Sequence, residues 1–386
     1  MVASFLAIFI WGSIDSLLGA ILPDLVARVH LTDARAGAVS LLNGVGLVAA
    51  SLCAGPLLDR FGKKSVFLPA LAVIALSLAG LGWAASFKEI CALALTLGLG
   101  GSMVVTAAQS LVSDLNPAER TAALNLLNFF FGLGAFVTPL ARTWLERLGG
   151  LAGTTMILAV ICLGVFGFDW TTRFPEPAHA AHKRRGPILA EPLFWLPTLI
   201  VFLYVGIETS VWYWQVVYWV REFGAALSHA RLGVSLFAAA IMAGRLMSRW
   251  ALRFISSRAL LLWGTGGSVA GLCGMRVASD FRLSVSSLIL AGLFMAVVFP
   301  TAIGVVGSRF PEASGTPIAL TVTAGWLGAM VVRPVIGFTA GLRGLGPAYW
   351  IVVAGAALML LLNLALASVD RATSRRQGAQ EAIAVP

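Results

Sequence analysis

The turn that decides the fold reads Gly55-Pro56-Leu57-Leu58-Asp59-Arg60-Phe61-Gly62-Lys63-Lys64. This polar segment separates two apolar runs, and each run reaches the roughly 20 residues that a helix needs to cross a bilayer. Glycine lets two helix ends approach and turn tightly. Asp59 can face the N-terminus of a neighbouring helix, and the basic residues can face carboxylates or lipid phosphate. We therefore expect a short turn between two membrane-spanning helices.

The composition of the whole chain agrees with a membrane location. Of 386 residues, 59% are hydrophobic and 11% are charged, whereas a soluble domain carries about 25% charged residues. This deficit excludes a water-soluble enzyme. The net charge of +10 is better explained by positively charged cytoplasmic loops than by a nucleic-acid partner, which we do not expect. The four cysteines lie in apolar runs without paired spacing, so we expect neither disulfides nor a metal site.

Apolar windows of spanning length occur twelve times, in two groups of six. The approximate windows are 2–26, 34–57, 65–84, 88–112, 120–144, 150–168, 193–219, 229–253, 258–276, 282–308, 315–341 and 346–368. The segment between the groups is long and polar. The sequence therefore predicts an all-α integral membrane protein with twelve transmembrane helices in two pseudo-symmetric six-helix bundles. The N-terminal bundle comprises residues 1–168. The C-terminal bundle comprises residues 193–386 and ends in a short cytoplasmic tail. A cytoplasmic linker, 169–192, joins the two bundles.

Two further patterns concern the orientation and the relation of the halves. Lysine and arginine are more numerous in the loops on the linker side than in the opposite loops, which places both termini in the cytoplasm. We expect a multi-pass protein of a bacterial inner membrane. The halves repeat short segments in matching order, such as Leu133-Gly134-Ala135 and Leu327-Gly328-Ala329. Weak internal repeats of this kind are typical of secondary transporters.

The turn at 55–64 resembles the G-x-L-x-D-R-x-G-R-K signature of the major facilitator superfamily and lies in the loop where that family carries it. The resemblance implies the twelve-helix fold and transport by alternating access. In the family this loop acts as a latch that favours one of the two access states, so the resemblance implies a conformational role without substrate contact. The residues concerned are Gly55, Asp59, Arg60, Gly62, Lys63 and Lys64, with Arg245 in the matching segment of the second half.

Within the superfamily, segments 11–15, 122–135 and 202–208 are similar to the fucose-permease-like group of sugar:proton symporters. The fucose permease uses one carboxylate in helix 1 and another in helix 4, whereas the stretch 105–109 of this chain contains no acid. Drug:proton antiporters form the competing group and tend to carry an arginine in helix 4 and a Gly-Pro motif in helix 5. This sequence has neither feature, which favours the sugar symporters.

Charged side chains inside the windows are the strongest functional signal. A charge at mid-membrane costs roughly 3 kcal/mol and usually faces a cavity or a partner. Asp15, Glu208 and Arg333 lie at such depth, and Arg245 lies nearer a helix end. Asp15 and Glu208 occupy the first helix of each half, and we expect them to be the proton-coupling residues. The alternative is that one of them forms a structural ion pair with Arg333 or Arg245.

One helical face indicates what is bound. Tyr204, Glu208, Trp212, Gln215 and Trp219 follow one another at helical spacing and share this face. Aromatic planes that alternate with hydrogen-bonding groups suit a sugar, because its C–H faces stack on rings while its hydroxyls need partners. An interfacial aromatic belt is the alternative, and it explains Trp219 but not the deeper Tyr204 and Glu208.

Smaller polar groups complete the candidate substrate-binding set. Gln109, Asn125 and Asn128 form polar stripes on the fourth and fifth helices, where neutral amides can bind substrate or join helices. Trp326 precedes Arg333 by seven residues and so shares its helical face. Arg333 can bind an anionic substrate group, repel protons from a carboxylate or serve as an ion-pair strut.

Together these features predict a secondary active transporter for a small polar solute, first of all a monosaccharide, coupled to H⁺ or alternatively to Na⁺. The nearer alternative is a proton-coupled exporter or organic-anion carrier that uses Arg333. A membrane-embedded enzyme is more distant, because the sequence shows neither a nucleophile with a base nor a metal cluster. A Walker-type phosphate loop is also missing, which argues against an ATP-driven pump. We expect no cofactor, the solute and membrane lipid as partners, and a monomer.

Overall fold

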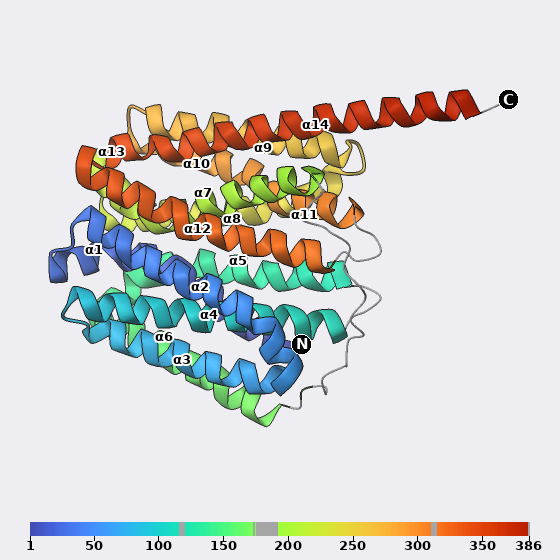
Figure 1. The fold of residues 1–386 in the computed structure, drawn as a ribbon. Coiled ribbons are helices and arrows are strands. Elements are labelled where there is room, and N and C mark those ends of the chain that lie inside the picture. Colours follow the sequence, from blue (N-terminus) through green and yellow to red (C-terminus); the bar gives the residue numbers. More distant parts are fainter. Residues whose placement is uncertain (116–119, 173, 175–191, 310–314, 385–386) are drawn as a thin grey trace.

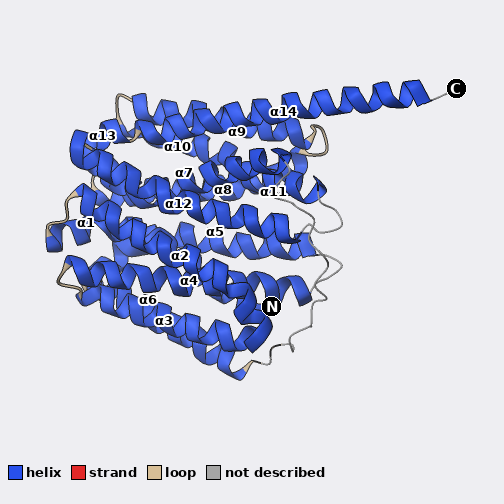
Figure 2. Cartoon of the chain, in the orientation of Figure 1, coloured by secondary structure: helices blue, strands red, loops and turns tan. Residues whose placement is uncertain are grey.

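The structure, a computed structural model, describes residues 1–115, 120–172, 174, 192–309 and 315–384 (Figure 1). Within these ranges the regular structure is helical and no strand occurs (Figure 2), so the all-helical prediction is confirmed. The N-terminal half contains α1 (Val2–Val29), α2 (Asp33–Phe61), α3 (Lys63–Trp83), α4 (Phe87–Leu115), α5 (Arg120–Leu145), the short η1 (Glu146–Leu148) and α6 (Gly150–Thr171). The C-terminal half contains α7 (Pro192–Phe223), α8 (Leu227–Ala251), α9 (Ser257–Val277), α10 (Phe281–Met295), α11 (Val298–Arg309), α12 (Gly315–Arg343), α13 (Leu345–Ala348) and α14 (Trp350–Ala384).

Local sequence explains where several helices begin and end. The Thr32 hydroxyl accepts the N–H of Arg35 (3.3 Å) at the start of α2, and the Asp280 carboxylate accepts the N–H of Leu283 (3.0 Å) at the start of α10. Such caps satisfy amides that have no partner within the first turn. Gly62 separates α2 from α3 with a φ of 78°, a left-handed conformation that favours glycine. The two helices therefore meet at a single residue.

Eleven of the described helical segments are long and apolar enough to cross a membrane, close to the twelve that the sequence predicts. The remaining expected window corresponds to α9, which packs alongside α10 and α14. The window expected at 282–308 is divided at Ala296 and Val297 into α10 and α11. Pro300 explains the division, because it has no N–H to donate to the carbonyl of Ala296 one turn earlier.

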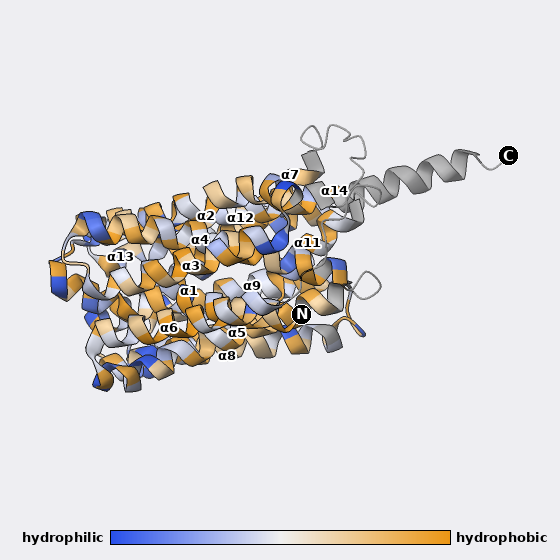
Figure 3. Cartoon of the chain, turned by 90° about the horizontal axis from the view of Figure 1, so that it is seen from below, coloured by the Kyte–Doolittle hydropathy of each residue, from blue (hydrophilic) through white to orange (hydrophobic). Residues whose placement is uncertain are grey.

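Figure 1 shows α1–α6 on one side of the molecule and α7–α14 on the other, with most helix axes running in roughly the same direction. We call the end where α1 begins and α14 leaves the bundle the terminal end, and the opposite end the distal end. Along the middle of the helices the residues are mostly apolar, whereas hydrophilic residues gather near the helix ends (Figure 3). Most of the predicted linker, 175–191, lies outside the described residues.

The two halves meet mainly where α1 packs against α7, α2 against α12, and α5 against α8. Glycines permit the closest approach. A Cβ on Gly337 of α12 would lie 2.6 Å from the Cα of Gly37 and 2.8 Å from the carbonyl oxygen of Asp33, both on α2. A Cβ on Gly44 of α2 would lie 2.7 Å from the Cα of Met330 on α12. Toward the distal end, α2 and α12 therefore pack backbone to backbone.

Gly337→Leu is expected to force α2 and α12 apart. Overpacking of this kind costs about 1–3 kcal/mol, and because the two helices belong to different halves, separation of the halves relieves the cost without unfolding. We expect a membrane-impermeant maleimide to label a cysteine placed at the buried Ser40 of α2 faster in this variant. Gly304→Leu is the matched control, since a Cβ on Gly304 meets nothing within 4 Å. Equal labelling in the two variants would contradict the packing described above.

Candidate substrate and coupling site

A buried ion pair joins the two halves near the middle of the bundle. Nη2 of Arg333 on α12 lies 3.6 Å from Oδ1 of Asp15 on α1, and the two side chains are 3% and 8% exposed. Nε and Nη2 of the guanidinium are buried and have no hydrogen-bond partner within the described ranges. Buried polar atoms are normally hydrogen-bonded, but Nη2 has only the 3.6 Å ion pair to Asp15 and Nε has no partner, so the guanidinium keeps donor capacity for a further acceptor.

A second group of opposite charges lies beside this pair. The strongest charge interaction of Glu208 on α7 is with Arg245 on α8, and it also interacts with Asp15 and Arg333. Tyr204, one turn before Glu208, is buried and interacts with the charges of Glu208 and Arg245. Its hydroxyl makes no hydrogen bond of normal geometry to a described residue. Two acids and two arginines are thus brought together from α1, α7, α8 and α12. We call these four charged residues the central group, and it has no net charge when all of them are ionised.

The acids of the central group do not form a ready metal site. In the part of the chain that the structure describes, no group of three or more His, Cys, Asp or Glu side chains is placed to hold a metal ion. Asp15 and Glu208 each have an arginine as their main opposite charge. Coupling to H⁺ stays a prediction, as does the Na⁺ alternative.

The predicted substrate face of α7 divides between two environments. Glu208 belongs to the central group, and Tyr204 adjoins it. Farther along, Gln215 Oε1 accepts a hydrogen bond from the Tyr349 hydroxyl (3.0 Å), and Trp219 Nε1 donates to Ser284 Oγ (2.8 Å). Trp212 is buried as well. Both hydrogen bonds stay within the C-terminal half, and a role of this stretch in substrate binding remains a prediction.

The remaining predicted substrate contacts lie on three different helices. Gln109 of α4, Asn128 of α5 and Trp326 of α12 are partly exposed. Two of these helices, α5 and α12, contact the other half. The side chain of Asn125 lies outside the described residues. The structure therefore neither joins these residues to the central group nor assigns them another task.

The predicted latch is held by contacts inside the N-terminal half. Lys63 forms an ion pair with Asp114 of α4. Nζ of Lys64 donates hydrogen bonds to the carbonyl oxygens of Trp170 (2.6 Å) and Thr172 (2.8 Å) at the end of α6. The junction of α2 and α3 is thus tied to two further helices, α4 and α6. Sequence reasoning did not identify these partners.

The other residues assigned to the latch are placed differently. The guanidinium of Arg60 lies 5.2 Å from the ring centroid of Phe61. Arg245 lies in the central group, beside Glu208. The side chain of Asp59 lies outside the described residues and Gly55 has none, so the conformational role of the turn stays a prediction.

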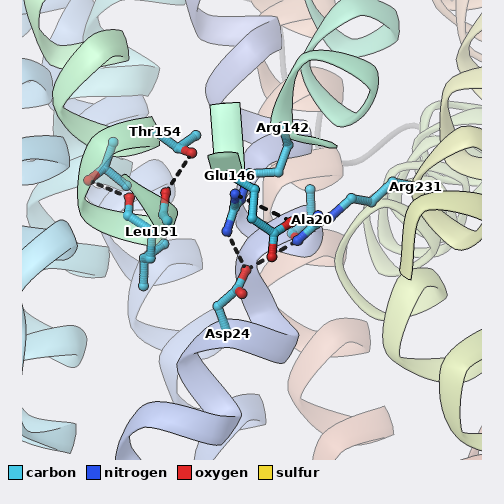
Figure 4. A network of polar contacts seen from close by, with 9 residues as sticks. Ala20, Asp24, Arg142, Glu146, Leu151, Thr154 and Arg231 are labelled. Atoms are coloured by element: carbon cyan, nitrogen blue, oxygen red, sulfur yellow. Dashed lines mark hydrogen bonds and ion pairs between the residues drawn. The ribbon is translucent and has the colours of Figure 1, made fainter. Parts of the chain in front are cut away.

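Sequence reasoning also missed a polar cluster at the distal end (Figure 4). Asp24 Oδ2 of α1 is 3.0 Å from Arg142 Nη2 of α5 and 3.3 Å from Arg231 Nη2 of α8. Glu146 Oε2 is 2.5 Å from Arg231 Nη1 and 3.7 Å from Arg142 Nη1. Both arginines are almost completely buried. We call these four residues the distal cluster. Arg231 alone belongs to the C-terminal half, so its ion pairs join the halves.

Two further contacts join the halves at the distal end. Arg221 Nη1 of α7 lies 2.6 Å from Oδ1 of Asp33, the first residue of α2. The Tyr213 hydroxyl of α7 donates to the carbonyl oxygen of Ala36 (2.9 Å). Together with the distal cluster, these contacts connect α1, α2 and α5 of one half to α7 and α8 of the other.

Comparison with known proteins agrees with this architecture. The family model described as Major Facilitator Superfamily matches residues 2–256 and 213–386. An uncharacterized MFS-type transporter of Yersinia pestis is 25% identical over 379 residues, 97% of this chain and 96% of that protein. The 4-hydroxybenzoate transporter of Pseudomonas aeruginosa is 29% identical over 198 residues, 48% of this chain and 43% of that protein.

Similarity to solved structures extends over nearly the whole chain. The crystal structure of a D-xylose-proton symporter matches with a TM-score of 0.82 and covers 94% of this chain and 96% of its own, at 14% sequence identity. At that identity the match shows a shared fold. Since the family model matches both halves, the chain belongs to the Major Facilitator Superfamily.

Proposed function

We propose that the chain is a proton-coupled transporter of small organic carboxylates that works by alternating access. The observation that carries this proposal is the pairing of Arg333 with Asp15 across the two halves, in which Nη2 is held only by a 3.6 Å ion pair and the buried Nε has no partner among the described residues. A guanidinium presents its donors as a planar fork, which fits a carboxylate through two parallel hydrogen bonds. In the proposed cycle a substrate carboxylate takes the place of the Asp15 carboxylate on Arg333.

This exchange of partners explains why proton and substrate move together. A buried charge without a counterion is strongly unfavourable. When Asp15 takes up a proton, Arg333 loses its counterion, and a substrate carboxylate restores it. When a substrate binds while Asp15 is ionised, two anions face one cation. Binding of the proton and of the anion is therefore mutually favourable, and the loaded site carries the same net charge as the empty one.

The neighbours of the ion pair suit the rest of such a substrate. The ring of Tyr204 lies 6.0 Å from the ring of Phe299, and this aromatic surface can contact the apolar body of a carboxylate. Glu208 interacts with Asp15 and Arg333 as well as with Arg245. It is therefore the second candidate for the proton. The 4-hydroxybenzoate transporter, a relative over part of the chain, carries an aromatic carboxylate.

The orientation belongs to the same proposal. We place both termini in the cytoplasm of a bacterium, because the loops at the terminal end carry the larger share of basic residues. The distal cluster then closes the outer entrance. Opening that entrance requires Arg231 to leave Asp24 and Glu146.

Uptake of labelled 4-hydroxybenzoate into proteoliposomes tests the proposal. An inward proton gradient should drive accumulation, and a protonophore should abolish it. Because neutral 4-hydroxybenzoic acid itself crosses lipid, protein-free liposomes and Arg333→Ala proteoliposomes set the baseline. Loss of a buried charged partner costs about 2–5 kcal/mol of binding, so we expect Arg333→Ala to match the protein-free level. Wild-type uptake at that level for 4-hydroxybenzoate, nicotinate and gallate would reject carboxylate transport.

A monosaccharide is the second candidate substrate, and the face of α7 favours it. The Gln215 Nε2 is buried without a hydrogen-bond partner in the described chain, and the buried Tyr204 hydroxyl makes no hydrogen bond of normal geometry there. Sugar hydroxyls pair with such groups. The same vesicles, supplied with labelled D-xylose or L-fucose, separate the two candidates. Proton-driven sugar accumulation that 4-hydroxybenzoate does not inhibit would favour the sugar.

A further inference from the structure

A groove opens on the surface of the N-terminal half between α3 and α6, near the terminal end. It has a volume of about 720 Å³ and is lined by Lys64, by Leu68 and Ala72 of α3 and by Phe166 and Trp170 of α6, among others. The proposed transport site uses none of these residues. We propose that this groove binds an anionic phospholipid, with the phosphate at Lys64 and an acyl chain along the apolar lining.

The groove opens toward the bilayer. Both α3 and α6 are long and apolar enough to span a membrane. On α6, Ile161, Phe168 and Trp170 are 46%, 45% and 63% exposed, so this helix presents apolar side chains to the surrounding medium. A hollow with an apolar lining holds water poorly, because water needs polar partners. In a membrane protein, an acyl chain is the occupant that the medium supplies.

Lys64 gives the groove a preference for negative charge. Its Nζ donates to the carbonyl oxygens of Trp170 (2.6 Å) and Thr172 (2.8 Å) and lies 5.9 Å from the ring centroid of Phe174. None of these contacts neutralises its positive charge, and the carbonyl oxygens use two of its three N–H donors. Asp169 interacts electrostatically with Lys64, but Asp169 is completely buried whereas Lys64 is partly exposed. A lipid headgroup therefore meets the cation and not the carboxylate.

Two further features match a lipid headgroup at this position. No side chain caps the start of α3, where Gly62 is the N-cap, so the N–H groups of its first turn have no side-chain acceptor there. Trp170 lies next to the last residue of α6, and exposed tryptophans are typical of the depth at which headgroups lie. With both termini in the cytoplasm, the groove lies in the leaflet that is richer in anionic lipid.

Native mass spectrometry of the purified full chain tests the proposal with phosphatidylglycerol and phosphatidylcholine of identical acyl chains. A single interfacial lysine favours an anionic lipid by a factor of about five. We expect the wild type to retain phosphatidylglycerol at least that much better, and Lys64→Ala to lose the difference. Lys88→Ala, which removes an exposed lysine at the other end of the same half, is the matched control and should retain it. Equal retention of the two lipids by the wild type would overturn the proposal.

A groove-filling variant keeps the test independent of the contacts that Lys64 makes with α6. Ala72→Trp places a ring in the groove and leaves Lys64 unchanged, so we expect retention of phosphatidylglycerol to fall to the level of Lys64→Ala. Leu76→Trp, on the same helix but at a position that is 72% exposed and does not line the groove, should bind as the wild type does. Thermal unfolding of each variant checks that it is folded. Undiminished retention by Ala72→Trp would show that the acyl chain lies elsewhere.

Discussion

Asp15→Asn yields a transporter that exchanges 4-hydroxybenzoate across the membrane but no longer accumulates it in response to a proton gradient. Asparagine has the shape of a protonated aspartic acid, so Arg333 is permanently available to the substrate carboxylate. Proteoliposomes measure both activities, since counterflow of labelled against unlabelled substrate reports exchange and gradient-driven uptake reports coupling. We expect counterflow to persist and gradient-driven uptake to fall to the level of the Arg333→Ala baseline.

The stability of the same variant provides an independent readout. Removing one partner of a buried ion pair costs about 3–5 kcal/mol, because the other charge is left uncompensated. A bound carboxylate supplies the missing negative charge. Saturating 4-hydroxybenzoate should therefore raise the melting temperature of Asp15→Asn more than that of the wild type. An equal shift in the two proteins would contradict the exchange of partners on Arg333.

Glu208→Gln is the companion variant, because Glu208 is the other acid of the central group. If Asp15 carries the proton, Glu208→Gln retains gradient-driven accumulation. If Glu208 carries the proton, Glu208→Gln loses gradient-driven accumulation and Asp15→Asn retains it. Unchanged accumulation in both variants would remove both residues from proton coupling.

Arg231→Ala should open the distal end. Arg231 is the member of the distal cluster that crosses between the halves, with ion pairs to Asp24 and Glu146 and a hydrogen bond to the Ala20 carbonyl oxygen (3.3 Å). In its absence Arg142 still pairs with both acids within the N-terminal half, but one negative charge is left uncompensated. A loss of about 3 kcal/mol in the closed state shifts the ratio of closed to open molecules by about two orders of magnitude.

Labelling of Ser40→Cys with an impermeant maleimide measures this shift, in a background that lacks Cys53, Cys91, Cys162 and Cys273. We expect much faster labelling in Arg231→Ala than in the parent. Arg147→Ala is the matched control, since Arg147 lies at the same end but is exposed and contacts the Trp144 ring (5.0 Å to the centroid). Equal rates in the two variants would show that the distal cluster does not hold the entrance closed.

The helices were predictable because the signal for a membrane helix is local. Length and hydropathy identified the windows to within a few residues, and a polar junction between α2 and α3 was evident from the turn that ends in Lys63-Lys64. The division of the tenth window was not predicted, although Pro300 was visible in the sequence. A single proline does not show whether a helix bends or breaks, because neighbouring helices can satisfy the freed carbonyl.

The charged sites were only partly predictable, because an ion pair between helices depends on packing. Depth in the membrane identified Asp15 and Arg333, but it did not show which acid pairs with which arginine. Arg142 and Arg231 lie close to the ends of predicted windows, where a charge needs no partner. The sequence therefore offers no reason to predict ion pairs for them. Only the approach of α1, α5 and α8 brings them to the same carboxylates.

The face of α7 illustrates the same limit. Helical spacing predicts that Gln215 and Trp219 lie on one side of the helix. It did not show which helix covers that side. In the structure Gln215 is covered by Tyr349 and Trp219 by Ser284, both of the same half. Tyr204 and Glu208, at the start of the face, lie at the central group.

Proton uptake on substrate binding tests the exchange of partners at Arg333 most directly. Purified protein in weakly buffered detergent at neutral pH is mixed with 4-hydroxybenzoate, and a pH-indicator dye reports the protons taken from solution. We expect the wild type to take up about one proton for each carboxylate bound, because binding is linked to protonation of Asp15, and Asp15→Asn to bind without proton uptake. Binding by the wild type with no proton uptake, or equal uptake by both proteins, would contradict the proposed coupling.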